Sequence, residues 1–279
     1  MRHLVIPGVH HLGIPGVRCL GLLAALALSA CGDGSTAPGG DNGSGSPPPD
    51  TPAFSHVQAP GASARAFLSD ETFDALVVEV DFVDGFDPGT EALDSLRTFL
   101  EARLHKPGGV TILLDDALPS NPGASYTLAE VRALEEAHRD RFTAGGTLAA
   151  YALFLDRPFE AEGVLGIAYF NTSMAIFEQV VRDHSGGVFE PPTPLVEATV
   201  LRHEVGHLLG LVNNGTAMQG TPGGADDHHD EAHGAHCTVE GSLMYFQVET
   251  VDFLATLTGG QVPRLEPLDL ADLRANGGR

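Results

Sequence analysis

One buried helix constrains the fold of this chain more than any other segment, and it runs from residue 193 to residue 210. Apolar residues surround His203, Glu204 and His207 on both sides, a pattern that predicts a helix inside the protein. The segment begins with Thr-Pro, a typical helix start, and it ends at Gly210, which can adopt the left-handed turn that closes a helix. Because unpaired polar groups are costly inside a protein, the two imidazoles and the carboxylate must have a binding partner.

The spacing of the two histidines indicates what that partner is. Side chains four residues apart lie one turn apart on the same helix face, so His203 and His207 can reach a single ion. Two histidines at this spacing, with a glutamate after the first, are typical of a zinc site. Glu204 lies off that face, beside the ion, where it suits a general base that takes a proton from water. A catalytic zinc usually takes three protein ligands, so a third is expected downstream.

Two segments resemble a known superfamily. His203–Gly210 reads HExxHxxG, which resembles the metzincin zinc peptidases, and that resemblance implies a third histidine three residues after the glycine. This chain has Asn213 there, a poor zinc ligand. Residues 236–244 resemble the archaemetzincin continuation, in which a His-Cys pair, four residues and Cys-x-Met follow. This second resemblance implies that His236 is the third ligand and that residues 211–235 are an insertion.

The same resemblance assigns roles to residues near the end of the motif. Met244 corresponds to the methionine of the Met-turn, a tight turn beneath the metal, although an ordinary core methionine is also consistent with the sequence. Ser242 stands where archaemetzincins have a second cysteine, and no CxxC follows. We therefore expect their second, structural zinc site to be absent and one catalytic zinc per chain. Cys237 is either a small buried hydrophobe or a thiol beside the zinc.

The insertion at residues 211–235 is rich in Gly, Asn, Asp and His, a composition that predicts a surface loop. His229 and His233 lie in it and are alternatives to His236 as third ligand. The acidic run at residues 226–231 offers carboxylates to Ca²⁺, but it lacks the spacing of a known calcium loop. A solvated acidic loop is the alternative.

The N-terminal 53 residues predict export. Residues 1–30 contain arginines followed by an apolar stretch that is too short to span a bilayer as a mature helix. Their end, Leu-Ser-Ala before Cys31, resembles a bacterial lipobox, which implies that Cys31 is acylated and becomes the first residue. Cleavage after Ala30 without a lipid is the alternative. Residues 31–53 predict a disordered tether, so we expect a lipoprotein at the outer membrane or cell surface.

The charge and the cysteines narrow the possible partners. The formal net charge of −22, from 15 Lys+Arg against 37 Asp+Glu, argues against nucleic acid or an anionic lipid surface. Membrane contact is therefore expected only through the lipid anchor, and the expected partner is a protein or peptide substrate of a monomer. Cys237 is the one cysteine after the tether, which excludes a disulfide within the folded part.

Residues 54–279 are the size of one domain and predict an α+β fold. Hydrophobic periodicity predicts alternating strands and helices before the zinc helix, and a helix near the C-terminus after it: strands over 76–82, 110–114, 148–155, 164–170 and 174–177, and helices over 90–104, 128–138 and 267–275. This order resembles a metzincin domain with a mixed twisted sheet, long helices, an active-site helix, a Met-turn and a C-terminal helix. Residues 166–169 resemble the edge strand above the zinc, although an interior strand fits the sequence equally well.

These observations predict a zinc metalloendopeptidase that hydrolyses peptide bonds outside the cytoplasm. Two alternatives belong to other classes. One is a catalytically silent zinc-binding surface lipoprotein, against which the intact Glu204 argues. The other is a lipoprotein that captures metal with its acidic, His-rich loop. Deleting that loop would abolish zinc binding in the second case, whereas a helix-based site would remain partly intact.

Overall fold

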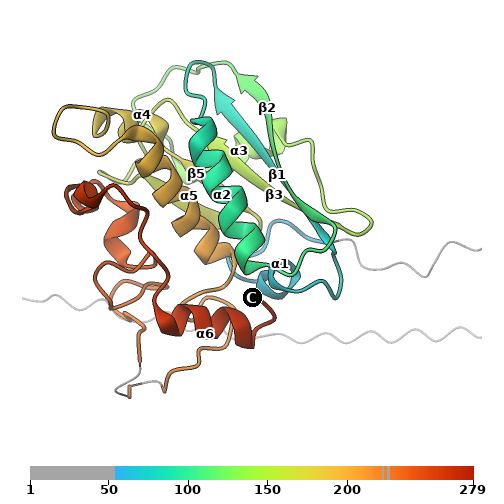
Figure 1. Cartoon of the computed structure of the whole chain (residues 1–279). Helices are drawn as coiled ribbons and strands as arrows, with labels where there is room; N and C mark the ends of the chain where they lie inside the picture. The colour runs from blue at the N-terminus through green and yellow to red at the C-terminus, as the bar shows by residue number, and fades with distance from the viewer. Residues whose placement is uncertain (1–53, 222, 225–226) are drawn as a thin grey trace, which may run out of the picture. The chain divides into compact units, whose positions relative to one another are not determined.

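A five-stranded sheet forms the centre of the computed structural model, which describes residues 54–279 except 222 and 225–226 (Figure 1). The strand order is β2-β1-β3-β5-β4, and only β4 runs antiparallel to its neighbour. The strands are β1 (Ala75–Val83), β2 (Gly109–Leu118), β3 (Thr147–Phe154), β4 (Gly166–Phe170) and β5 (Ser173–Ile176). The predicted signal, tether and lipidated Cys31 lie outside the described residues.

Helices cover both faces of this sheet. Helices α2 and α5 lie side by side on one face, and α3 lies on the other (Figure 1). The helices are α1 (Ala64–Leu68), α2 (Thr90–Arg103), α3 (Leu128–His138), α4 (Glu178–Asp183), α5 (Thr193–Leu208) and α6 (Pro267–Ala275), with 3₁₀ helices η1 (Phe246–Glu249) and η2 (Val251–Gly259). Because both faces are covered, β3 is buried along almost its whole length. The prediction of an α+β fold with a mixed sheet is confirmed.

β4 lies at the edge of the sheet, a position that the sequence did not distinguish from an interior one. β4 is the last strand of the sheet and contacts α5 directly. Just before β4, the Leu165 N–H donates to the Glu249 carbonyl over 2.7 Å, and the Val251 N–H donates to the Gly163 carbonyl over 3.0 Å. This short pairing brings the end of η1 against the start of β4 and places Glu249 near α5.

The insertion after α5 differs from the predicted surface loop. Leu211 and Val212 are fully buried, and His228 is only 2% exposed. The prediction of a solvated loop is therefore wrong for these residues. A few side chains anchor the loop in the protein while Gly215, Gly223 and Gly234 are exposed, and average composition does not reveal such anchors.

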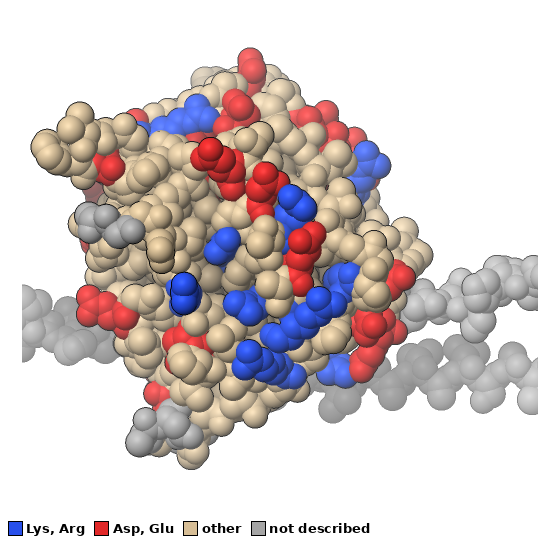
Figure 2. Space-filling view, viewed as in Figure 1, with Lys and Arg blue, Asp and Glu red and all other residues tan. Residues whose placement is uncertain are grey.

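Positively charged side chains gather on part of the surface despite the negative net charge (Figure 2). Figure 2 shows Lys and Arg side chains gathered on one face, where α1 and α6 lie. The pKa of Arg103 is lowered by burial and by the charge of Arg274, so these two guanidinium groups are close enough to repel. Among the residues that the structure describes, no helix is long and apolar enough to span a membrane.

Candidate metal centre

Helix α5 carries three of the predicted site residues in its last turns and then stops abruptly. His203, Glu204 and His207 are all buried. Gly210 follows the helix with φ +75°, and a Cβ there would lie 2.7 Å from the Cβ of Ala64. A side chain at this position would be strained by its backbone angle and by lack of space. Glycine therefore fixes the turn that ends α5.

Three imidazoles converge at the end of α5. The Nε2 atom of His203 lies 3.1 Å from Nε2 of His207 and 3.3 Å from Nε2 of His236. Four ligands around zinc at 2.0–2.1 Å in tetrahedral geometry would be separated by roughly 3.3 Å. The spacing of the three nitrogens therefore fits a zinc ion bound between them.

Hydrogen bonds on the far side of the rings orient two of these ligands. Nδ1 of His203 lies 2.7 Å from the Leu243 carbonyl, and Nδ1 of His236 lies 2.7 Å from the His233 carbonyl. A carbonyl can only accept, so each Nδ1 carries the proton and each Nε2 presents a lone pair to the centre. Burial first, and His236 second, lower the pKa of His203 to about 4, so that ring is neutral, as a metal ligand must be.

Glu249 is a fourth member of this cluster that sequence reasoning missed. Its Oε2 lies 3.7 Å from Nε2 of His236 and 3.9 Å from Nε2 of His203. Burial would raise the pKa of Glu249, but His236 and His203 outweigh that effect and lower it. Glu249 follows Met244 by five residues and belongs to no recognisable motif, so no signal in the sequence singles it out. His203, His207, His236 and Glu249 together form a buried group that can hold a metal ion.

Glu204 lies beside this cluster with its carboxylate unsatisfied. Neither of its oxygens has a hydrogen-bond partner among the described residues, although the side chain is completely buried. Burial, and then the charge of Glu249, raise the pKa of Glu204 well above its usual value. An unpaired buried carboxylate is costly and points to a ligand or water that completes it.

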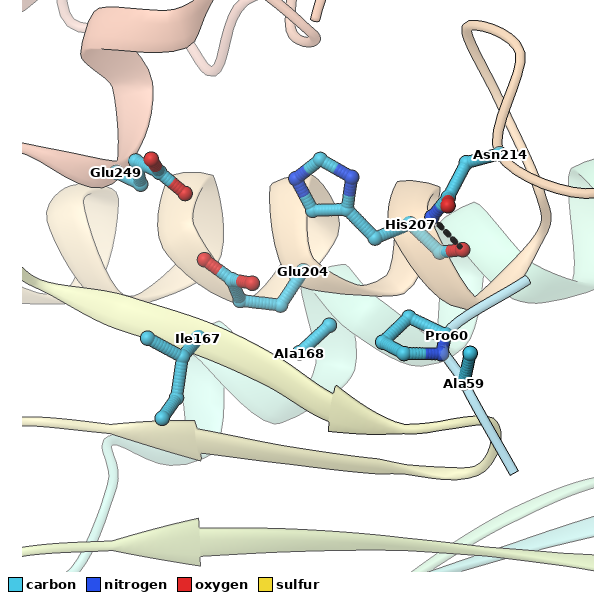
Figure 3. Close-up of a pocket in the computed structure, with 8 residues that line it drawn as sticks. All are labelled: Ala59, Pro60, Ile167, Ala168, Glu204, His207, Asn214 and Glu249. Atoms are coloured by element: carbon cyan, nitrogen blue, oxygen red, sulfur yellow. Dashed lines mark hydrogen bonds between the residues drawn. The ribbon is translucent and has the colours of Figure 1, made fainter. Parts of the chain in front are cut away.

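The carboxylate faces a cavity between α5 and β4. This cavity has a volume of about 230 Å³, and Figure 3 shows Glu204, His207 and Glu249 around the space above Ile167 and Ala168 of β4. The strand approaches the helix closely, because a Cβ at Gly166 would lie 2.8 Å from Oε1 of Glu204. An edge strand and the candidate metal ligands thus border the same cavity.

Met244 lies in a tight turn packed under α5. The Tyr245 N–H donates to the Ser242 carbonyl over 3.2 Å and closes the turn, and Met244 is fully buried within it. A Cβ on Gly206 would lie only 2.2 Å from Sδ of Met244. The thioether therefore fills the space left by the missing side chain, one residue before His207. The preceding carbonyl, that of Leu243, is the one that orients His203.

We expect Gly206→Ala to destabilise the protein by about 1–3 kcal/mol, because the new methyl group overlaps Met244. The same substitution in a helix without this contact would stabilise by about 1 kcal/mol. Urea unfolding of Gly206→Ala, Met244→Ala and the double variant measures the coupling. Alanine at position 244 removes the obstacle, so the cost of Gly206→Ala should fall in that background, and fully additive costs would contradict the contact.

The other residues considered as ligands lie elsewhere. Nε2 of His229 lies 2.8 Å from the Gly234 carbonyl, and the His233 ring stacks on Phe246 at a centroid distance of 3.7 Å. Asn213 is exposed. In the acidic run proposed for Ca²⁺, the Asp227 carboxylate accepts hydrogen bonds from backbone N–H groups of its own loop, while the Asp230 carboxylate contacts His233.

Comparison of the sequence with models of known protein families and with curated proteins finds no match. The function is therefore inferred from the arrangement of the residues themselves. Of the predicted ligands, the structure brings His203, His207 and His236 together, and it adds Glu249 to them.

Proposed function

We propose that this protein is a zinc-dependent endopeptidase of metzincin type. The observation that carries the proposal is the convergence of three histidines, in which Nε2 of His207 and Nε2 of His236 lie 3.1 Å and 3.3 Å from Nε2 of His203, beside a buried, unpartnered Glu204 carboxylate. Three imidazole nitrogens with an adjacent carboxylate are the donor set of a catalytic zinc site. A helix that served only as a structural element would have no reason to bury these groups together.

Each side chain has a separate part in the proposed reaction. Zinc held by His203, His207 and His236 would supply a Lewis acid that activates water and polarises the scissile carbonyl. Glu204 takes the proton of the attacking water and then gives it to the leaving amine. The Leu243 and His233 carbonyls hold two of the rings in the tautomer that this ligation needs.

The edge strand indicates how a substrate binds. β4 is the last strand of the sheet, and its residues Ile167 and Ala168 line the cavity beside Glu204. An extended peptide can add to such an edge through main-chain hydrogen bonds. These bonds recognise the backbone of the peptide and do not require a particular side chain. This mode of binding would place an internal peptide bond next to Glu204, and it supports an endopeptidase acting on unstructured segments.

Features outside the ligands support the metzincin relationship. Gly210 ends the zinc helix with a positive φ, Met244 lies in a turn under that helix, and α6 follows near the C-terminus. The departure from the common pattern is the exposed Asn213, whose role His236 takes after the long insertion. The sequence that ends at Cys31 resembles a lipobox, which supports export of this protein as a lipoprotein.

The position of Glu249 supports one alternative function, that of a catalytically silent zinc-binding lipoprotein. Structural zinc sites are closed by four protein ligands, whereas catalytic sites keep one position open. Glu249 would make such a fourth ligand if its carboxylate moved onto the ion from its position 3.7 Å from Nε2 of His236. The two candidates differ in turnover and not in zinc content.

The test is hydrolysis of an unstructured protein by the purified chain. We expect cleavage at internal peptide bonds, its loss after zinc is removed with a chelator, and its return on adding back zinc but not calcium. Mass spectrometry of the products identifies the cleaved bonds. Full zinc content without cleavage would favour the silent protein, and cleavage that survives removal of zinc would overturn the proposal.

A further inference from the structure

A second group of metal-binding side chains lies outside the candidate active site. His228, Cys237, Glu266 and Asp269 each present one donor atom, and these atoms all lie within 4.8 Å of one another. They come from the insertion, from the His-Cys pair that follows it and from the start of α6, which lies further along the sequence. No sequence motif joins them, and the proposed peptidase reaction does not use them.

His228 is the centre of this group. Its Nδ1 lies 3.0 Å from Oε1 of Glu266 and 3.2 Å from Oδ1 of Asp269, and its Nε2 lies 3.1 Å from Oδ2 of Asp272. His228 is 2% exposed, and both aspartates are completely buried. The two sides of the ring therefore have different neighbours, with a pair of carboxylates on one side and a single one on the other.

Two of the atoms on the first side have no hydrogen-bond partner, whereas Oε1 of Glu266 accepts from the Asp269 N–H over 3.0 Å. Nδ1 of His228 and Oδ1 of Asp269 are both buried without a hydrogen-bond partner. The other oxygen of Asp269 is occupied, because it accepts from the Ser242 hydroxyl over 3.1 Å and from the Glu266 N–H over 3.2 Å. Two buried polar atoms that lie 3.2 Å apart without hydrogen-bond partners are the arrangement expected of atoms that bind a cation.

The Asp272 side of the ring has the geometry of a support for a metal ligand. A histidine that binds metal through one nitrogen usually donates its other N–H to a carboxylate. Asp272 can accept from Nε2 of His228 at 3.1 Å, and the Gln219 N–H donates to the other Asp272 oxygen over 2.6 Å. Nδ1 of His228 is then the nitrogen left to bind an ion.

The negative charge of the cluster also favours a bound cation. Glu266, Asp269 and Asp272 bring three carboxylates to one imidazole, so even a protonated His228 leaves an excess of negative charge in a buried place. A divalent ion between His228, Cys237, Glu266 and Asp269 removes this excess. Imidazole and thiol donors select zinc and related transition metals over calcium, which prefers oxygen ligands alone.

We propose that His228, Cys237, Glu266 and Asp269 bind a second divalent transition-metal ion of the zinc class. This ion ties the insertion to α6 and to the segment that contains His236 and Met244. Cys237 follows His236 directly, and its N–H donates to the Met244 carbonyl over 2.7 Å. The ion therefore holds the third ligand of the first site in place, and the expected content rises from one ion per chain to two.

Cobalt(II) separates the two sites, because only the second includes a sulfur ligand. The full chain loaded with cobalt(II) should bind two ions and show a thiolate-to-cobalt charge-transfer band. The double variant His203→Ala/His207→Ala should lose one ion and keep the band, so this result does not depend on the proposed peptidase. Cys237→Ser should abolish the band, and His228→Asn should abolish it and lose one ion.

His229→Asn is the matched control, since His229 is the next residue and its ring contacts the Gly234 carbonyl instead. It should keep both cobalt ions and the band. The wild-type measurements decide the proposal even if a variant fails to fold. One ion per chain, or two ions without a thiolate band, would overturn it. His228 would then be a buried imidazolium, because Asp269, Asp272 and Cys237 overcome the effect of burial and raise its pKa to about 12.

Discussion

Replacement of Glu204 by glutamine is expected to lower peptidase activity by about 10²–10⁴-fold, the usual contribution of a general base. Zinc content and the unfolding temperature should change little, because Glu204 is not among the side chains grouped around the metal position. Glutamine has nearly the same shape and fills the same buried space, but it cannot take a proton from water. Rates of peptide cleavage and zinc content, measured on the same preparation, check both statements.

Glu197→Gln is the matched control for this prediction. Glu197 is also buried on α5, but its Oε2 accepts from the Gly89 N–H over 3.0 Å, away from the cavity. Glutamine can accept the same hydrogen bond through its carbonyl, so activity should persist. Loss of zinc in Glu204→Gln would mean that Glu204 is a ligand. Unchanged cleavage in Glu204→Gln would remove the general-base role altogether.

Sequence periodicity predicted the regular elements because local patterns encode them. The helix predicted over 128–138 was found at Leu128–His138, with Thr127 and Glu130 forming the reciprocal hydrogen bonds that begin it. The strand predicted over 110–114 extends further, to Leu118, where pairing with β1 continues past a shift in register. The C-terminal end of β2 is determined by its pairing with β1, and a local sequence pattern does not encode this tertiary contact.

The candidate site was predictable only where its residues share one helix. The spacing of His203 and His207 fixes their common face, and Glu204 follows from the same helix. Glu249 reaches the site because the Leu165 N–H pairs with its carbonyl, a contact between segments 84 residues apart in numbering. The approach of His228 to α6 likewise depends on the path of the insertion. The composition of that loop predicted that it is solvated, and it did not indicate that His228 is buried.

Replacement of His236 by alanine is expected to weaken zinc binding at the first site as severely as His207→Ala does. Each variant removes one of three Nε2 atoms that lie within 3.1–3.3 Å of a neighbouring Nε2. The loss should exceed the roughly 10–100-fold change that follows removal of an outer partner of a ligand. Competition with a chromophoric zinc chelator measures the affinity in each variant, and cleavage activity should fall in parallel.

The two other histidines of the loop provide matched controls, and one of them is a stringent test. The His233 carbonyl orients Nδ1 of His236 over 2.7 Å, and this carbonyl belongs to the main chain, so His233→Ala keeps it. His233→Ala loses only the stacking on Phe246 and the contact with Asp230, and His229→Ala loses a contact with a backbone carbonyl. Both variants should retain zinc at the first site. A severe loss of zinc affinity in either variant, with zinc retained in His236→Ala, would show that the third ligand is a histidine of the loop. Only the assignment of the two ligands on α5 would then remain.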